Sequence, residues 1–158
     1  MTNHNSWIEH RAVYPYAGFD IEFKYPNSIT IAHSIDNCLC VGVDTEFYNE
    51  NDASFEDNTR QWCICLLDTT EYSVDYLISS WKTVFTGEVI EKRDTVIIGN
   101  LKALRVILKS KEPNASYRQL IYLKKYSTLF EVMNVDESTG KEFEVFCESI
   151  KIIRNKKP

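Results

Sequence analysis

The chain has 158 residues, of which 44% are hydrophobic and 26% are charged, close to the average for globular proteins. This length and composition exclude a disordered or fibrous chain and predict a single domain, residues 1 to 158, with a core of its own. The formal net charge of −5 excludes nucleic acid as an expected partner, because nucleic-acid-binding surfaces carry concentrated positive charge.

The amino-terminal segment carries neither the apolar core nor the small-residue cleavage site of a secretory signal. No later apolar run has the length of a membrane span. We therefore expect a cytoplasmic protein without a membrane partner. The five cysteines are an odd number in a chain too long to be a disulfide scaffold, which also favours a reducing compartment.

The first predicted elements are short strands. Residues 1 to 17 have no hydrophobic period and are expected to form an irregular lead-in. Residues 19 to 25 alternate apolar and polar side chains, which predicts a half-buried strand that ends at Pro26. Short runs at residues 29 to 32 and 38 to 43 are expected to continue this strand as an antiparallel meander.

A fully buried strand and a helix are predicted next. Residues 61 to 67 form a continuous apolar run, which is typical of a strand covered on both faces. Between positions 68 and 85 the hydrophobic spacing changes to three and four residues, which predicts a helix. Thr70 or Ser73 is expected as its N-cap and Gly87 as its stop.

The second half of the chain predicts a meander followed by a helix. Four β-rich runs are separated by turn residues: 88 to 98, 101 to 110, 116 to 126 and 128 to 135. Residues 139 to 153 place apolar side chains on one stripe, and Thr139 with Glu142 completes a capping box, which predicts a second helix. Residues 154 to 158 are expected to be a frayed tail.

These elements predict an α+β domain in which helices flank an antiparallel β-sheet. Three segments are distinctive: the strand end FKYP at residues 23 to 26, the glycine-centred hairpin IGNLKA at 98 to 103, and the ESI sequence at 148 to 150. With the order of elements, they resemble the PsbP-like domain family. The resemblance implies an α/β/α sandwich and a non-enzymatic protein that binds a protein partner. The chain differs from exported members of the family, because it has no signal and no lipobox cysteine near Met1.

Residues 44 to 59 contain six carboxylates and no basic residue, and their Asn, Asp and Ser content predicts a surface loop. Such a loop attracts a basic protein, and its aromatic side chains supply desolvated contacts. The predicted partner-binding residues are Asp44, Glu46, Phe47, Tyr48, Glu50, Asp52, Phe55, Glu56 and Asp57. A solvated acidic loop without a partner is the alternative. The stretch lacks the glycine and regular oxygen spacing of a calcium-binding loop.

The meander carries the opposite charge. Its six cations are Arg105, Lys109, Lys111, Arg118, Lys124 and Lys125. They form either a basic patch or, as their alternation favours, a solvated strand face that discourages edge pairing.

Cys38, Cys40, Cys63 and Cys65 form two CxC pairs on predicted strands, where residues two apart share one face. Two adjacent strands would therefore bring four thiols together. The favoured interpretation is that these cysteines pack in the core as small hydrophobes. A zinc site or redox chemistry is the alternative, although an extended CxC spaces its sulfurs poorly for chelation. No cofactor or metal is predicted.

The sequence contains no recognisable catalytic motif. Its histidines, His4, His10 and His33, have no sequence context that pairs them with a cysteine nucleophile, and there are no glycine-rich phosphate loops. We therefore predict a non-catalytic cytoplasmic protein-binding module with a basic partner, and not an enzyme. Two alternatives remain: an immunity protein that neutralises a bacterial toxin, and a small-molecule carrier or enzyme with a pocket between helix and sheet.

Overall fold

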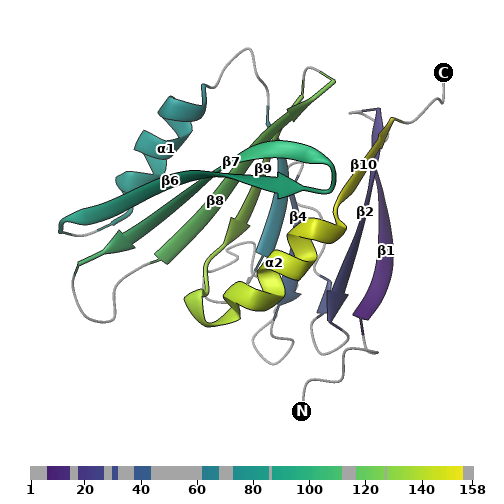
Figure 1. The fold of residues 1–158 in the computed structure, drawn as a ribbon, viewed down its shortest axis with the longest axis horizontal. Coiled ribbons are helices and arrows are strands. Elements are labelled where there is room, and N and C mark those ends of the chain that lie inside the picture. Colours follow the sequence, from purple (N-terminus) through teal and green to yellow (C-terminus); the bar gives the residue numbers. More distant parts are fainter. Residues whose placement is uncertain are drawn as a thin grey trace, which may run out of the picture.

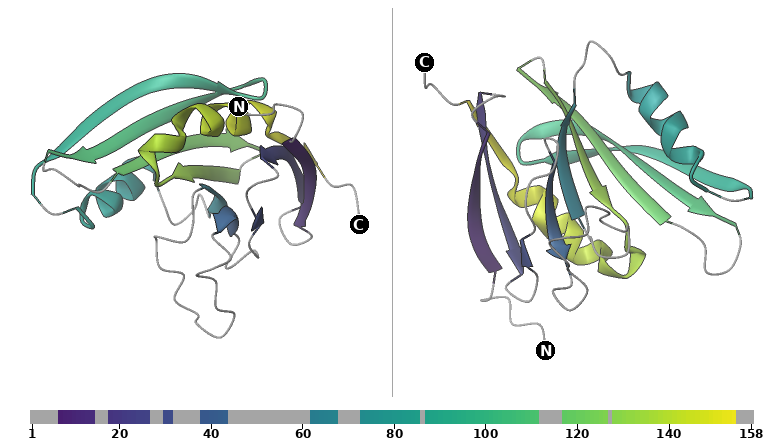
Figure 2. Two further views of the ribbon diagram at one scale, coloured as in Figure 1. Left: turned by 90° about the horizontal axis from the view of Figure 1, so that it is seen from below. Right: turned by 180° about the vertical axis from the view of Figure 1, so that it is seen from behind.

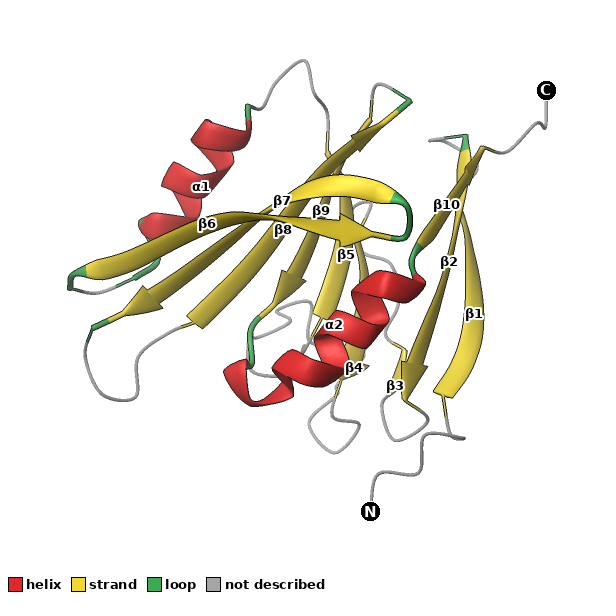
Figure 3. Cartoon of the chain, viewed as in Figure 1, coloured by secondary structure: helices red, strands yellow, loops and turns green. Residues whose placement is uncertain are grey.

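The structure, a computed structural model, describes residues 7–14, 18–26, 30–31, 38–43, 62–67, 73–85, 87–111, 117–126 and 128–154. Two α-helices and ten strands lie in these ranges (Figures 1 and 3). The strands are β1 (Trp7–Tyr14), β2 (Phe19–Pro26), β3 (Thr30–Ile31), β4 (Cys38–Val43), β5 (Trp62–Leu67), β6 (Val89–Ile98), β7 (Leu101–Ser110), β8 (Tyr117–Lys125), β9 (Thr128–Asn134) and β10 (Lys151–Arg154). The helices are α1 (Val74–Lys82) and α2 (Gly140–Ser149), and a 3-10 turn at Glu137–Thr139 precedes α2.

The strands form two antiparallel sheets. The strand order is β3-β4-β5-β9-β8-β7-β6 in the larger sheet and β1-β2-β10 in the smaller one. Strands β6 to β9 pair with their neighbours in sequence, which confirms the predicted meander. Strand β9 then lies beside β5, so the meander is joined to the first half of the chain at the centre of the larger sheet.

Each face of the larger sheet buries its own core, as expected when successive side chains of a strand point to opposite faces. Ile121 and Leu123 of β8 pack with α2 and the three-stranded sheet. Leu120 and Tyr122 of the same strand pack with α1 on the opposite face. Figure 2 shows β6 and β7 curving around the side that carries α2. Helix α2 therefore lies on the concave face of the larger sheet.

The predicted α/β/α sandwich, in which helices flank one antiparallel sheet, is wrong. The fold is β-rich, and a second sheet lies beside α2 on the larger sheet (Figure 1). The inner residues of this second sheet, including Phe19, Ile21 and Phe23, belong to the same buried core as α2. Strand β1 lies in the segment predicted as an irregular lead-in, and most of β10 lies in the segment predicted as the end of the second helix. Sequence periodicity therefore did not reveal this layer.

Strand β1 corrects the prediction that residues 1 to 17 form an irregular lead-in. Residues 7 to 14 pair one to one with β2. Arg11 of β1 donates to Asp20 at 3.0 and 2.6 Å and to Glu22 at 3.2 Å. Because the groups that stabilise this strand lie in β2, its own hydrophobic pattern does not indicate it.

The second helix ends earlier than the predicted 139 to 153. Ser149 Oγ donates to the carbonyl oxygen of Phe146 at 2.6 Å and accepts from the backbone N–H of Lys24 at 2.8 Å. Ile150 is extended, and the following strand β10 pairs with β2 and buries Ile152. Pairing with the free edge of β2 therefore outweighs the helical period of these residues.

The predicted capping box is also wrong, because the Thr139 side chain makes no cap bond to α2. The Thr139 hydroxyl donates to the carbonyl oxygen of Asp136 at 2.9 Å and accepts from Trp62 Nε1 at 3.3 Å. The carboxylate of Asp136 caps the preceding 3-10 turn by accepting from Ser138 N at 3.0 Å. Thr139 thus links the turn to β5, and its hydroxyl is not used to begin the helix.

The predicted N-cap of the first helix and the predicted buried strand at residues 61 to 67 are confirmed. Helix α1 begins after Ser73, whose side chain accepts from Tyr76 N at 3.1 Å. The predicted helix stop at Gly87 is wrong, because α1 ends at Lys82 with Thr83 as its C-cap. Strand β5 is buried on both faces from residue 62 to residue 66. Among the described residues, no helix is long and apolar enough to cross a membrane.

Replacing Gly99 by Ala is expected to lower the free energy of unfolding by more than about 1 kcal/mol. Gly99 has a φ of 58° in the turn between β6 and β7, and a Cβ would lie 2.7 Å from the carbonyl oxygen of Ile150. Urea denaturation followed by circular dichroism measures the change. Gly140→Ala is the control, because its Cβ meets nothing within 4 Å in a helical backbone. A Gly99→Ala variant as stable as the wild type would contradict this close approach.

Candidate functional site

The sequence-predicted partner-binding residues lie outside the described residues. All nine fall between residues 44 and 57, in the stretch between β4 and β5. The structure therefore neither brings them together nor separates them. The described part of the chain provides three other features to consider: the cations of the meander, the hollows beside α2, and a row of buried polar groups under α1.

Most of the meander cations have carboxylate or carbonyl partners within the domain. Their ion pairs are Arg105 with Asp94, Lys109 with Glu137 at 3.0 Å, and Lys111 with Glu88 at 2.8 Å. The Arg105 guanidinium holds the pKa of Asp94 below its usual value by hydrogen bonding. Lys125 donates to the carbonyl oxygen of Ile152 at 2.9 Å, and Arg118 is buried against the Trp81 ring. These contacts favour the paired, solvated face over a basic patch.

Two hollows lie on the concave face of the larger sheet. One, of about 330 Å³, lies between α2 and strands β6 to β8, and its apolar wall includes Ile98, Ile121 and Phe143. The other, of about 440 Å³, lies toward the far end of the same strands, where Lys92 and Ile107 are register partners. The first hollow lies between a helix and the sheet, which is the position expected of the pocket in the small-molecule alternative.

The two CxC pairs face each other across β4 and β5. Cys38 is the register partner of Cys65, and Cys40 is the register partner of Cys63. Cys38 and Cys65 form a disulfide with a Cα–Cα distance of 4.0 Å, and Cys63 is buried. The prediction that strand neighbours bring the pairs together is confirmed. The favoured interpretation as reduced core cysteines is wrong for Cys38 and Cys65, because paired strands place their sulfurs within bonding reach.

The remaining cysteine belongs to a different core. Cys147 is a free thiol on α2, and burial raises its pKa. Within the described residues, no group of three or more His, Cys, Asp or Glu side chains is arranged to hold a metal ion. The Cys38–Cys65 disulfide is therefore the reactive cysteine group that the described residues provide.

Glu131 of β9 is a buried carboxyl group beneath α1. Its Oε2 accepts from the Tyr122 hydroxyl at 2.7 Å and from Trp81 Nε1 at 3.1 Å. Glu131 is 5% exposed, and burial raises its pKa. Burial, together with the neighbouring Glu131, also raises the pKa of Tyr122. Both groups are therefore held in a setting that favours their protonated forms.

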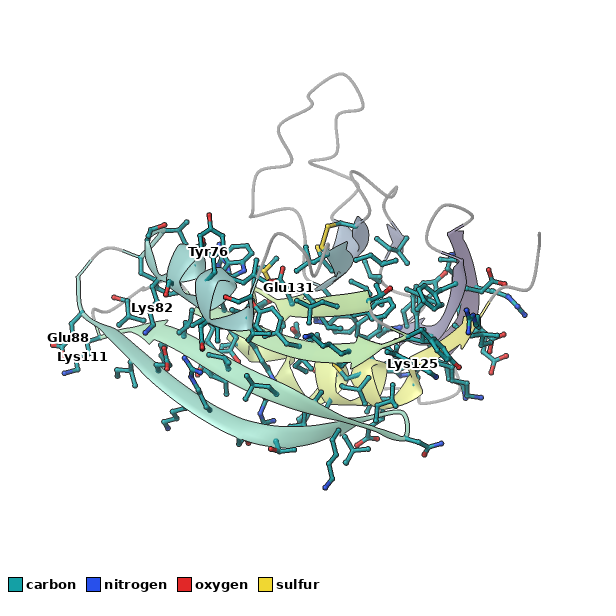
Figure 4. All side chains as sticks on the ribbon, turned by 90° about the horizontal axis from the view of Figure 1, so that it is seen from above. Tyr76, Lys82, Glu88, Lys111, Lys125 and Glu131 are labelled. Carbon is teal, nitrogen blue, oxygen red and sulfur yellow. A yellow bond between two sulfur atoms is a disulfide. The ribbon has the colours of Figure 1, made fainter. Side chains whose placement is uncertain are left out.

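The disulfide and this carboxyl group belong to one row across the sheet. Cys38 pairs with Cys65, Cys65 with Glu131, and Glu131 with Tyr122, on four successive strands. Opposed side chains on neighbouring strands have Cβ atoms about 4.5 to 5.5 Å apart. Figure 4 shows Glu131 on the side of the sheet that carries the disulfide. The side chain of Cys65 therefore lies next to that of the buried Glu131 in this row.

Sequence reasoning missed Glu131, Tyr122 and Trp81 as members of a site. The available signal was the run TLFEVMN, in which a single carboxylate interrupts an apolar strand between Phe130 and Val132. A carboxyl group in a strand buried on both faces needs hydrogen-bond partners, because an isolated buried charge is very costly. The identity of those partners depends on how α1 and β8 pack.

Comparison with solved structures shows two proteins that share the fold. A protein of Bacteroides thetaiotaomicron VPI-5482, solved by crystallography at 1.50 Å resolution, has a TM-score of 0.53 and 12% identity over 92% of this chain. The alignment covers 48% of that protein, so the chain spans about half its length. LpqN of Mycobacterium tuberculosis, a protein involved in cell envelope biogenesis, has a TM-score of 0.52 and 11% identity, with 96% of this chain and 92% of LpqN covered.

These similarities establish the fold alone, because the identities are 11% and 12%. No family model and no curated protein sequence matches the chain. Neither of the two proteins is named as a PsbP-like domain, so the resemblance drawn from the sequence stays a prediction. Function must therefore be argued from the chain's own residues.

Proposed function

We propose that this chain is a non-catalytic domain that binds a basic protein partner in the cytoplasm. The observation that carries the proposal is the distribution of charge. The six carboxylates of residues 44 to 57 exceed the whole net charge of −5, so the rest of the chain has a net charge of +1. Concentrated charge of one sign steers a partner of the opposite sign during diffusional encounter.

The contacts of the described residues support this assignment. Arg105, Lys109 and Lys111 are neutralised by carboxylates of the same domain. The segment 44 to 57 has no basic residue of its own to neutralise it. Its aromatic residues Phe47, Tyr48 and Phe55 are the proposed anchors, since aromatic side chains dominate the buried centre of protein interfaces. An immunity protein is one form of this proposal, in which the partner is a bacterial toxin.

The cytoplasmic location has a consequence for the disulfide. In a reducing compartment the disulfides that do occur are usually transient and take part in redox reactions. A cytoplasmic domain with the Cys38–Cys65 bond is therefore expected to exchange that bond with other thiols, and the half-buried position of Cys38 leaves it open to them.

The hollow between α2 and strands β6 to β8 favours a second candidate function, the binding of a small apolar ligand. Its volume of about 330 Å³ is at the lower end of the range for small-molecule pockets, and Ile98, Ile121 and Phe143 line it. Val96 of β6 also lines this hollow, and Val96→Trp is expected to fill it. Such a ligand would lose affinity for Val96→Trp and would bind variants of the acidic segment normally.

Reversing charge at Glu50 and Asp52 to Lys is expected to slow association with the basic partner about tenfold, because electrostatic steering accounts for a factor of that order or more. The partner is first isolated by capture on the wild-type domain from native lysate and identified by mass spectrometry. Association of the purified pair is then measured by biolayer interferometry at two salt concentrations, since added salt screens this attraction.

The matched control carries the same change of net charge elsewhere, at Glu9 and Glu142, where Glu9 is an exposed side chain of β1 and Glu142 lies in the first turn of α2. It should associate almost as fast as the wild type. Equal slowing in both variants would show that net charge acts without a defined surface. Unchanged association of the Glu50 and Asp52 variant would refute the proposed function.

A further inference from the structure

The Cys38–Cys65 disulfide has one sulfur in a more accessible position than the other. Cys38 lies on β4 and is half-buried, whereas Cys65 on β5 is 8% exposed. The side chain next to Cys65 in the same row is Glu131. An incoming thiol would therefore reach the Cys38 sulfur, while the sulfur that leaves belongs to Cys65, the register partner of Glu131.

We propose that Cys38, Cys65 and Glu131 form a thiol–disulfide exchange centre that reacts with a dithiol. In this centre Glu131 supplies the proton to the departing Cys65 sulfur. The proposal is independent of the protein partner proposed above, because it rests on the row beneath α1 and not on residues 44 to 57. It assigns to the domain a redox activity in addition to binding.

The exchange balances in two steps. A thiolate of the dithiol attacks Cys38 Sγ, the bond to Cys65 Sγ breaks, and Cys65 takes the proton of Glu131. The second thiol of the reagent then loses its proton to solvent and attacks the mixed disulfide, so Cys38 is released as a thiolate and the reagent leaves as a cyclic disulfide. Solvent returns protons to Glu131 and Cys38. Two electrons have passed from the dithiol to the protein, which now has two thiols.

The hydrogen bonds of Glu131 suit it for this role. Both the Tyr122 hydroxyl and Trp81 Nε1 donate to Oε2, and no described residue donates to Oε1. The other oxygen, Oε1, is therefore the one that can carry the acid proton. Because burial raises its pKa, the group remains a proton donor at a higher pH than an exposed glutamate.

The charged and titratable side chains that the structure describes around Glu131 give it no counter-ion. Tyr122 faces it from β8 and Cys65 faces it from β5. From α1 it receives the neutral Trp81 side chain, against whose ring the Arg118 guanidinium lies at 5.7 Å. The charged residues of α1 pair with β6: Asp75 with Arg93 and Lys82 with Glu91. No ion pair with another described residue therefore holds Glu131 in its ionised form.

The test follows reduction of the oxidised full-length protein by dithiothreitol. Free thiols are trapped by alkylation at successive times, and mass spectrometry of peptides reports the state of Cys38 and Cys65. Glu131→Gln keeps one carbonyl oxygen that can accept from both Tyr122 and Trp81 but has no acid proton. It is expected to be reduced about tenfold more slowly near neutral pH, since loss of general acid catalysis has at least this effect.

The pH profile separates proton donation from a structural effect. In Glu131→Gln, the rate should rise with pH in proportion to the reagent thiolate. In the wild type, the profile should bend to a plateau above the pKa of Glu131, because loss of its proton offsets the gain in thiolate. Tyr122→Phe removes one hydrogen bond that lowers the pKa of Glu131, so its bend should move to higher pH.

Glu144→Gln is the control, because it removes an exposed carboxylate from α2 and should follow the wild-type profile. Circular dichroism confirms that each variant is folded, and the Tyr122→Phe profile tests the proposal if Glu131→Gln does not fold. A disulfide that dithiothreitol reduces only after denaturation would show a purely structural cross-link and overturn the proposal. Identical rates and profiles for the wild type and Glu131→Gln would overturn it as well.

Discussion

Trp62→Ala is expected to lower the free energy of unfolding by about 3 to 5 kcal/mol, as large-to-small substitutions of buried aromatic residues do. The Trp62 side chain is fully buried on β5. Its ring stacks on Phe146 at a centroid distance of 5.0 Å and lies 6.0 Å from Phe143, so truncation leaves a cavity between β5 and α2. It also removes the hydrogen bond from Nε1 to Thr139. Urea denaturation followed by far-ultraviolet circular dichroism measures the loss.

The control for Trp62→Ala is a substitution on the exposed face of α2, the helix against which Trp62 packs. Val145 is 48% exposed, so Val145→Ala should change stability by less than about 0.5 kcal/mol. The comparison separates packing against β5 from the helix propensity of α2. A cost below about 1 kcal/mol for Trp62→Ala would contradict the described packing, because a cavity of that size cannot be closed without larger rearrangement.

The contribution of Glu131 to the free energy of unfolding is expected to fall as pH rises above the ordinary range for glutamate, because Glu131 holds its proton in the folded state. In acid, Glu131 is protonated in both states and has no effect on the pH dependence. As pH rises through the unfolded pKa, the unfolded chain releases this proton first, and unfolding becomes more favourable. The slope from one such group is at most about 1.4 kcal/mol per pH unit, and it ends once pH passes the raised pKa of the folded state.

Glu131→Gln removes this titration. The difference in stability between Glu131→Gln and the wild type should therefore increase in favour of the variant as pH rises. Urea denaturation under oxidising conditions, at several pH values from acid to mildly alkaline, provides the measurement. Glu144→Gln should keep the wild-type dependence, because Glu144 is exposed on α2. Parallel curves for the wild type and Glu131→Gln would show that the carboxyl group is ionised in the folded protein.

Much of the larger sheet could be predicted because its strands carry local signals. The runs that became β6 to β9 alternate or are continuously apolar and are bounded by turn residues such as Gly99. The smaller sheet could not be predicted in the same way. Strand β1 depends on its pairing with β2, and β10 follows a helical pattern until Ile150 becomes extended. Both strands form by pairing with the two edges of β2, and the hydrophobic pattern of each segment does not reveal this pairing.

The candidate redox site shows the same division. Residue spacing placed Cys38 with Cys40 on one face of their strand, and Cys63 with Cys65 on one face of theirs, but it did not settle whether the sulfurs would bond. The spacing in β9 showed a single carboxyl group within an apolar run, but not its neighbours. The Trp81 hydrogen bond depends on the docking of α1, which brings residues 50 positions apart into contact.

The sequence by itself determined the meander, the start of α1, the buried strand β5 and the negative charge of residues 44 to 57, because each depends on residues close together in the chain. Only the tertiary structure decided the second sheet, the end of α2 and the row from the disulfide to Tyr122. These features depend on groups far apart in the sequence. Their partners are selected by the free edges and buried faces that exist only after the sheets have paired.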